Sequence, residues 1–174
     1  GLGDVYKRQV MTNMGFSKFC EANGIDFVST KVGDRYVLES MLQNGYNIGG
    51  EQSGHIIFLD HSTTGDGELS GAMLLSIMKR TGEKLSDLAK IMERYPQVLI
   101  NVKVSNEGKL SFYTDKEVKA EINRVTEILG DTGRILVRVS GTEPLVRVML
   151  EGENLEQIQT LAEEAAQVVR ERLA

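Results

Sequence analysis

The pattern of apolar residues changes near residue 95, and this change limits the folds that are open to the chain. Before it, runs with strand character and a run with helical spacing alternate, with short connections, as is typical of α/β units. The order is strand, helix, strand, strand, at 27–32, 35–43, 47–50 and 56–59. After it, apolar residues alternate from 98 to 104, which indicates a half-buried strand. The sequence therefore predicts two modules that meet near Arg94.

Two helices complete the first module. The TTGDG segment at 63–67 is suited to capping a helix that ends at Gly82. Apolar residues recur in it at helical spacing, namely Leu69, Met73, Leu74, Ile77 and Met78. A second, short helix follows at 85–92, and we expect the methionine-rich face to pack in the core. In the helix at 35–43 we expect Val37, Met41 and Leu42 on one side, with Asn44-Gly45 as its C-cap.

The second module reads as two helices on an antiparallel sheet. An amphipathic helix spans Val118 to Leu129, two strands at 134–139 and 145–150 flank a polar turn, and a long helix runs from Leu155 to Leu173. We thus expect a mixed-sheet α/β domain at 10–94, followed by a smaller α+β domain with helices packed on a sheet at 95–174. Residues 1–9 have neither signal-peptide character nor periodicity, and we interpret them as a foreign leader or as disordered.

Composition excludes several partner classes. The formal net charge is −5, which argues against nucleic acid or an anionic membrane as a partner, so any bound anion must be held by a local cluster of donors. No apolar run reaches transmembrane length. Cys20 is the single cysteine, which rules out an internal disulfide and fits a cytoplasmic location.

The strongest binding signal is the turn at 138–147, which reads RVSGTEPLVR. Its candidate phosphate-binding residues are the two bracketing arginines and the turn between them, namely Arg138, Ser140, Gly141, Thr142 and Arg147. Hydroxyls and backbone N–H groups in such a turn can form an anion-binding concavity, and guanidinium forks suit the paired oxygens of a phosphate. The alternative is a polar hairpin with solvated arginines. A carboxylate at Glu143 would repel a phosphate, so we expect it to turn away, toward a basic residue that positions the loop.

A second candidate loop lies at 49–55 and reads GGEQSGH. Glu51, Ser53 and His55 can together accept and donate hydrogen bonds to vicinal sugar hydroxyls. A metal site made with His61 has too few obvious ligands to be favoured. The alternative is a structural glycine turn with a solvent-facing His55, and this loop taken alone leaves the two readings open.

The motifs together make the sequence similar to the α-D-phosphohexomutase family, from about Val10 to the end. The matching segments are TKVGDRYV at 30–37, GGEQSGHIIF at 49–58, STTGDG at 62–67 and RVSGTEPLVRVMLEG at 138–152. The resemblance implies the third and fourth of four domains, with Glu51, Ser53 and His55 recognising the sugar and the 138–147 loop holding phosphate. It also implies that Asp34 and Arg35 are further contacts in the cleft, and Gln52 favours the branch that acts on hexosamine phosphates.

The family's reaction moves a phosphoryl group between O6 and O1 of a hexose phosphate. The resemblance therefore implies conversion of glucosamine 6-phosphate to glucosamine 1-phosphate, which supplies UDP-N-acetylglucosamine for cell-wall synthesis. It implies a phosphoserine, a glucose- or glucosamine-1,6-bisphosphate type of intermediate, and Mg²⁺ on an aspartate-rich loop.

This chain carries neither the family's serine context nor its aspartate-rich metal loop, and Asp66 in TTGDG is a lone acidic residue. We therefore expect no catalytic residue, no metal ligand and no mutase activity in this chain alone, with the missing N-terminal domains of the same protein as its partner. The alternatives are a stand-alone sugar-phosphate binding module, another phosphohexomutase acting on glucose or mannose phosphates, and a purely structural pair of domains.

Overall fold

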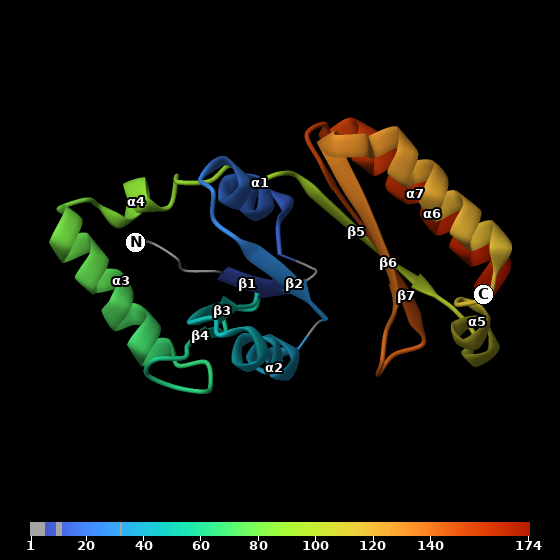
Figure 1. Ribbon diagram of the computed structural model, residues 1–174. Helices are drawn as coiled ribbons and strands as arrows, with labels where there is room; N and C mark the ends of the chain where they lie inside the picture. The colour runs from blue at the N-terminus through green and yellow to red at the C-terminus, as the bar shows by residue number, and fades with distance from the viewer. Residues whose placement is uncertain (1–5, 10–11, 32) are drawn as a thin grey trace. The chain divides into compact units, whose positions relative to one another are not determined.

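The computed structural model describes residues 6–9, 12–31 and 33–174, with side chains from residue 12 onward. The chain forms two compact units, Gly1–Arg94 and Tyr95–Ala174. Each unit has its own sheet (Figure 1). The expected fold class, a mixed-sheet α/β unit followed by an α+β unit, is confirmed.

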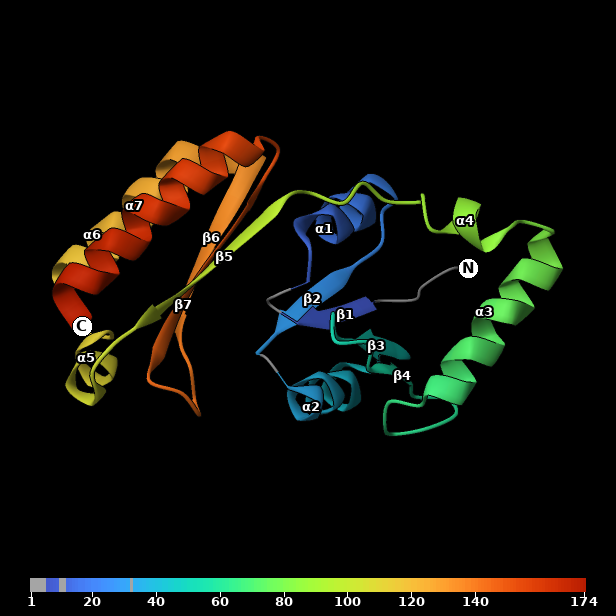
Figure 2. The same ribbon diagram turned by 180° about the vertical axis from the view of Figure 1, so that it is seen from behind.

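The first unit is built on a four-stranded sheet with the order β2-β1-β3-β4 (Figure 2). Its strands are β1 (Tyr6–Gln9), β2 (Phe27–Thr30), β3 (Ile48–Gly50) and β4 (Ile56–Phe58). β1 runs parallel to β2 and β3, whereas β4 pairs antiparallel with β3. The helices are α1 (Met14–Ala22), α2 (Asp34–Asn44), α3 (Gly67–Thr81) and α4 (Leu85–Leu88).

The start of the chain differs in part from the expectation. Residues 1–5 lie outside the described residues, but Tyr6–Gln9 form a strand and are therefore not the disordered segment that we considered. A parallel ladder is made by backbone groups, so this run joins the sheet between β2 and β3 without any apolar periodicity of its own. The foreign origin of these residues stays a prediction. Val32, expected at the end of a strand, also lies outside the described residues.

Helix α2 covers the sheet through a small core made of Val37, Met41 and Ile57. A Cβ on Gly49 would come within 2.3 Å of the Met41 sulfur, so only glycine lets β3 approach the helix this closely. Gly45 ends the helix in the left-handed conformation, as Asn44-Gly45 predicts. The expectation that Leu42 lies on the buried side is wrong. Leu42 is 61% exposed, because it lies 100° around the helix from Met41.

The caps of α3 match the expectation, but its burial does not. Asp66 accepts the N–H of Leu69 at 2.9 Å, and Gly82 ends the helix with a left-handed φ of 74°. None of its residues is buried, and Leu74 and Ile77 of the expected apolar face are 38% and 37% exposed. The expected core packing of this face is therefore wrong. The reason is a cavity of about 720 Å³, which is lined both by Ile77 of α3 and by Ile56 and Phe58 of the sheet.

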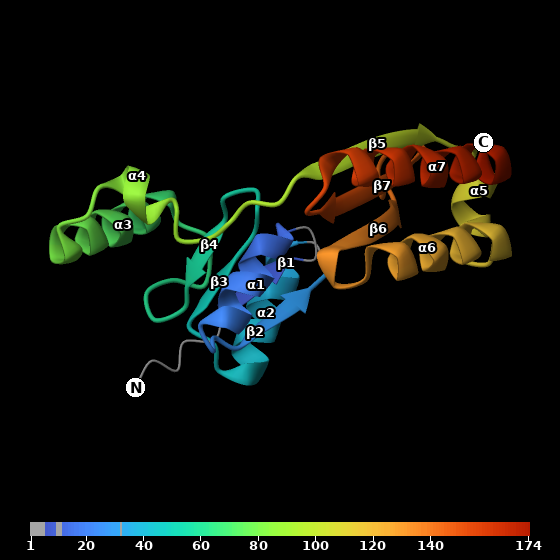
Figure 3. The same cartoon turned by 90° about the horizontal axis from the view of Figure 1, so that it is seen from above.

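The second unit is a three-stranded antiparallel sheet with the order β5-β7-β6. Its elements are β5 (Gln97–Lys103), α5 (Asn106–Ser111), α6 (Lys116–Leu129), a 3₁₀ turn (Gly130–Thr132), β6 (Gly133–Val139), β7 (Leu145–Gly152) and α7 (Leu155–Leu173). The long helices α6 and α7 lie side by side along the sheet (Figures 1 and 3). Leu155, which the helical pattern places on the apolar side of α7, is 53% exposed at its first turn.

The core of the second unit joins the sheet to both helices. Its fully buried residues include Val146, Val148 and Leu150 from β7, Val125 from α6, and Ile158 from α7. Burying one such side chain contributes about 1.5–3 kcal/mol relative to leaving it exposed. The turn between β6 and β7 therefore projects from strands that are firmly anchored.

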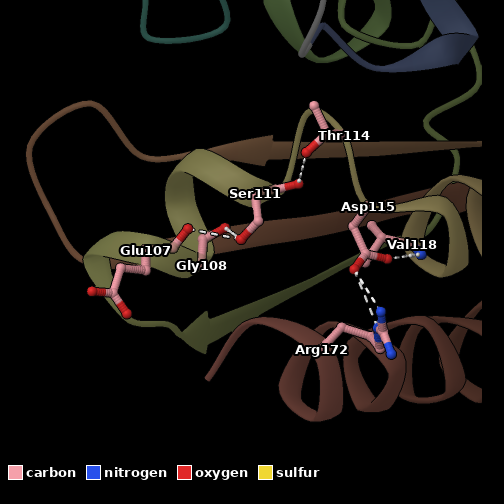
Figure 4. A network of polar contacts seen from close by, with 7 residues as sticks. All are labelled: Glu107, Gly108, Ser111, Thr114, Asp115, Val118 and Arg172. Atoms are coloured by element: carbon pink, nitrogen blue, oxygen red, sulfur yellow. Dashed lines mark hydrogen bonds and ion pairs between the residues drawn. The ribbon is translucent and has the colours of Figure 1, made fainter.

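A polar network holds the end of this unit at which α5, α6 and α7 meet (Figure 4). Asp115 caps α6 by accepting the N–H of Val118 at 3.0 Å, and its other oxygen accepts Arg172 of α7 at 3.1 Å. On α5, the Ser111 hydroxyl donates a hydrogen bond to the carbonyl of Glu107. The Val118 N–H, followed by Arg172, lowers the pKa of the Asp115 carboxyl below its ordinary value.

We expect Asp115→Ala to destabilise the second unit by about 1–2 kcal/mol at pH 7, because the substitution removes the helix cap together with the contact to Arg172. The lowered pKa means that the carboxylate stabilises the fold above its ordinary pKa of 3.8 and that this contribution is lost as the pH falls below that value. Urea unfolding at pH 7 and in acid measures both effects. Asp131→Ala, at an exposed position in the 3₁₀ turn, is the matched control. Equal stability of the Asp115 and Asp131 variants would contradict the role of the network.

Candidate functional site

The turn between β6 and β7 is closed by its own hydrogen bonds. The Ser140 N–H donates to the Leu145 carbonyl at 2.8 Å, and the Glu143 N–H donates to the Ser140 hydroxyl at 3.2 Å. Ser140 is buried, whereas Gly141 and Thr142 at the tip are exposed. The Ser140 hydroxyl therefore shapes the turn, and the tip presents its groups to solvent.

Two arginines stand opposite each other at the base of this turn. Arg138 of β6 is the register partner of Arg147 of β7. The Nε atoms of both side chains are buried and have no hydrogen-bond partner. Burial, and next the repulsion by Arg147, lower the pKa of the Arg138 guanidinium. Like charges in directly opposed positions are unfavourable, and an anion held between them would relieve the repulsion.

Glu143 has a basic partner, as expected, but the partner is one of the two candidate phosphate ligands. Its Oε2 accepts Arg147 Nη2 at 2.9 Å. The carboxylate therefore does not turn away from the arginines of the loop.

Lys109 is a residue near this loop that the sequence pattern does not indicate. It lies on α5, and its Nζ donates to the Glu143 carbonyl at 3.0 Å. The two residues are 34 positions apart, and α5 is too short for periodicity to reveal it. Only the tertiary structure brings this lysine to the turn.

The second candidate loop is the tight turn from β3 to β4. The Glu51 N–H donates to the His55 carbonyl at 2.8 Å, and the Gly54 N–H donates to the Glu51 carbonyl at 3.0 Å. Gly54 has a φ of 97°, which disfavours any residue with a side chain. The turn thus brings Glu51, Ser53 and His55 together.

The Glu51 carboxylate lies at the centre of this loop. Its Oε1 accepts the N–H of Gly33 at 3.0 Å, and its Oε2 accepts the Ser53 hydroxyl at 3.2 Å. His55 Nδ1 lies 3.9 Å from Oε2, and the side chain of His55 is 62% exposed whereas that of Glu51 is 9% exposed. The contacts from Gly33 and Ser53 therefore hold the carboxylate in a defined orientation within the loop.

The bond to Gly33 connects this loop to the segment that holds Asp34 and Arg35. Asp34 accepts the N–H of Arg35 at 2.7 Å, and Arg35 Nε donates to Glu39 at 2.8 Å. The Arg35 side chain is 81% exposed and is paired along α2. The structure therefore brings Gly33, rather than the side chain of Arg35, to Glu51. The positive φ of Gly33, 127°, is a feature that its TKVGDRYV context does not reveal.

The loop between β4 and α3 packs against His55. A Cβ on Gly65 would lie 3.3 Å from the His55 Cβ, and the Asp66 N–H donates to the Ile56 carbonyl at 3.4 Å. Gly50, Glu51 and Gln52 also line the 720 Å³ cavity of this unit. Of the sugar-recognition candidates, Glu51 therefore lies at the border of a space large enough for a small molecule.

Within the described residues, His, Cys, Asp and Glu side chains form no group of three or more that could hold a metal ion. No helix among those residues is long and apolar enough to cross a membrane. Each candidate loop lies within one unit, the first in Tyr95–Ala174 and the second in Gly1–Arg94.

Comparison with protein-family models gives two matches that together span most of the chain. The model described as phosphoglucomutase/phosphomannomutase, alpha/beta/alpha domain III, matches residues 3–95, and that of the C-terminal domain matches residues 99–168. The chain belongs to the phosphoglucomutase/phosphomannomutase family. This agrees with the resemblance to the α-D-phosphohexomutases that the motifs show.

Two relatives show a kind of enzyme within this family to which the chain is similar. The chain is 53% identical over 164 residues to a phosphoglucosamine mutase of Caldanaerobacter subterraneus, which covers 94% of this chain and 37% of that protein. It is 52% identical over 165 residues to a phosphoglucosamine mutase of Clostridioides difficile, with 95% and 37% covered. The chain thus spans about 37% of the length of these relatives.

A solved structure shares the fold. The Aspergillus fumigatus N-acetylphosphoglucosamine mutase in complex with GlcNAc-6P and magnesium aligns with a TM-score of 0.79 at 16% identity, covering 99% of this chain and 39% of that chain. At this identity the likeness concerns the fold alone.

We expect Glu51→Ala to speed hydrogen exchange of the Gly33 amide roughly fivefold, which corresponds to the loss of one hydrogen bond of about 1 kcal/mol. Exchange measured by NMR at this single amide checks the connection between the two loops. Glu51→Gln keeps an acceptor oxygen and should change the rate less. Glu39→Ala, which removes only the partner of Arg35, is the control. An unchanged Gly33 rate in Glu51→Ala would show that the bond does not hold the loop.

Proposed function

We propose that this chain supplies the sugar-recognition and phosphate-anchoring loops of a phosphoglucosamine mutase, which interconverts glucosamine 6-phosphate and glucosamine 1-phosphate. The observation that carries the proposal is the identity of 53% over 94% of the chain to a phosphoglucosamine mutase. The paired arginines at the base of the 138–147 turn supply the chemistry that such a substrate needs. This identity also favours the amino sugar over the glucose and mannose phosphates named in the family description.

The phosphate loop binds the phosphate that is not reacting. Arg138 and Arg147 offer forked guanidinium groups from adjacent strands, and their buried, unpartnered Nε atoms favour a ligand that accepts hydrogen bonds there. Gly141 and Thr142 add N–H and hydroxyl donors at the exposed tip, and Ser140 keeps the turn closed. Because these donors are held by paired strands, the phosphate is positioned with little reorganisation.

The loop at 51–55 binds the sugar hydroxyls. Glu51 is fixed by Gly33 and Ser53, so its carboxylate points in a defined direction, and the exposed His55 can donate or accept beside it. Asp34 and Arg35, which flank this loop through Gly33, are proposed as further contacts in the cleft. Hydrogen bonds of this kind do not depend on which end of the hexose carries the reacting phosphate, as a mutase requires.

The reaction also needs a group that donates the phosphoryl and, in the family, Mg²⁺ and a bisphosphorylated sugar intermediate. In the part of the chain that the structure describes, His, Cys, Asp and Glu side chains form no group of three or more that could hold a metal ion. We propose that the phosphoserine and the metal loop belong to the remaining domains of the intact protein. A single buried cysteine and a phosphorylated sugar substrate support a cytoplasmic location.

We expect the chain alone to show no turnover of glucosamine 6-phosphate, and a chimera that joins it to the remaining domains of the Caldanaerobacter relative to be active. A coupled assay for glucosamine 1-phosphate measures both proteins, with glucose 6-phosphate and mannose 6-phosphate as competing substrates. Turnover by the chain alone would contradict the assignment of the catalytic groups to other domains. If the chimera prefers glucose or mannose phosphate, that sugar phosphate is the substrate in place of the amino sugar.

We expect Arg138→Ala and Arg147→Ala each to weaken binding of inorganic phosphate by about 1.5–3 kcal/mol per charged hydrogen bond lost. Titration calorimetry on the chain measures the effect. Arg170→Ala on α7 removes the same charge from an exposed helix position and is the control. Glu51→Gln should weaken hexosamine phosphate binding but leave inorganic phosphate binding intact. Equal phosphate affinity in the double arginine variant and the unaltered chain would refute the phosphate loop.

A further inference from the structure

We propose that Glu143 is an internal counter-ion of the phosphate loop, and that substrate phosphate must displace its carboxylate from Arg147 in order to bind. The inference rests on the proposed function of this loop. It adds a residue that sets how tightly the loop holds phosphate and how readily it lets phosphate leave.

The position of Glu143 is fixed from several sides. Its N–H donates to the Ser140 hydroxyl at 3.2 Å, and its carbonyl accepts both the Leu145 N–H at 2.8 Å and Lys109 Nζ at 3.0 Å. With the backbone held in this way, its carboxylate reaches Arg147 Nη2 at 2.9 Å. The ion pair is therefore a consequence of how the turn is built.

The ion pair between Glu143 and Arg147 can form in the absence of a ligand and can still be displaced by a phosphate. The Glu143 side chain is 52% exposed and that of Arg147 is 31% exposed, so solvent and ligands reach both groups. Ion pairs at such positions are typically worth well under 1.4 kcal/mol, the energy that corresponds to a tenfold change in affinity. A phosphate that accepts from two guanidinium groups gains more than this pair loses.

The two positive charges at the base of the loop explain why it needs a counter-ion such as the Glu143 carboxylate. Arg138 and Arg147 are register partners on adjacent strands, and in the absence of a ligand only one carboxylate, that of Glu143, is paired with them in the described contacts. When a phosphate enters, the carboxylate becomes a like charge beside it and has to turn outward. When the phosphate leaves, the carboxylate returns to Arg147, so the two arginines are never left facing each other without an anion.

This exchange fits a reaction in which the bisphosphorylated intermediate has to reorient. A loop that held phosphate through two unopposed arginines would bind the intermediate more tightly and release it more slowly. Glu143 lowers the affinity of the bound state and offsets part of the cost of release. Its substitution should therefore strengthen phosphate binding, which is the opposite of what loss of a binding residue does.

The test is a titration of the full chain with inorganic phosphate at low ionic strength, in which NMR chemical shifts report the binding. We expect Glu143→Gln to bind phosphate about two- to fivefold more tightly than the unaltered chain, the range that corresponds to an exposed ion pair. Glu127→Gln is the matched control, because it removes the same charge from the last turns of α6, and α6 leads into the start of β6 rather than into the turn at its end. In the Arg147→Ala background the Glu143→Gln gain should disappear.

The outcomes separate this inference from the proposed function. If Glu143→Gln gives no gain while Arg147→Ala weakens binding, the counter-ion role is wrong and the phosphate loop stands. If Glu143→Gln gives the same gain as Glu127→Gln, the effect is general electrostatics and the counter-ion role is again wrong. If neither Glu143→Gln nor Arg147→Ala changes the affinity, both the inference and the phosphate loop are overturned.

Discussion

The register of β6 against β7 is the constraint on which the proposed phosphate loop depends. It sets Arg138 opposite Arg147 at the base of a turn only a few residues long. A slip of one strand by one residue would turn the arginine of that strand to the other face of the sheet and separate the two charges. The register is itself held by the alternate residues of the same strands, such as Val146 and Val148, which are fully buried against the helices. The core thus stabilises an arrangement of charges that is unfavourable without an anion.

The sugar loop is built on a different principle. Its central carboxylate, Glu51, is largely buried and is satisfied by backbone and hydroxyl donors of the protein, notably Gly33 and Ser53. A hydroxyl ligand brings no charge, so this loop needs orientation rather than unpaired donors. In the 138–147 loop the Nε atoms of Arg138 and Arg147 have no hydrogen-bond partner, whereas the 51–55 loop holds its carboxylate in a fixed orientation. The two arrangements suit the proposed roles, phosphate binding by the 138–147 loop and sugar binding by the 51–55 loop.

Local patterns predicted the elements whose partners are adjacent in sequence. The spacing of Val118, Val125 and Leu129 identified α6, and Gly45 and Gly82 marked helix ends, because caps and amphipathic faces are properties of short segments. Patterns failed where the deciding partner lies far along the chain. Lys109 reaches the turn across 34 positions, and β1 is a strand because β2 and β3 offer backbone partners on both sides. Helix α1 was not predicted from the sequence, although Met14 and Cys20 are buried. The candidate site was predicted as two loops, but the partner of Glu143 and the bond from Glu51 to Gly33 depend on the tertiary structure.

The two units differ in how completely they bury their apolar surface, and this bears on what the chain can do by itself. In the second unit, α6 and α7 supply a continuous core, so the phosphate loop rests on a scaffold that needs no further support. In the first unit, α3 buries no residue, and a cavity borders Gly50, Glu51 and Gln52. Side chains that line a cavity lose packing partners and hold their position less firmly than those in a filled core. The phosphate loop is therefore the better preorganised of the two, and the sugar loop gains more from any ligand or neighbouring segment that fills the space beside it.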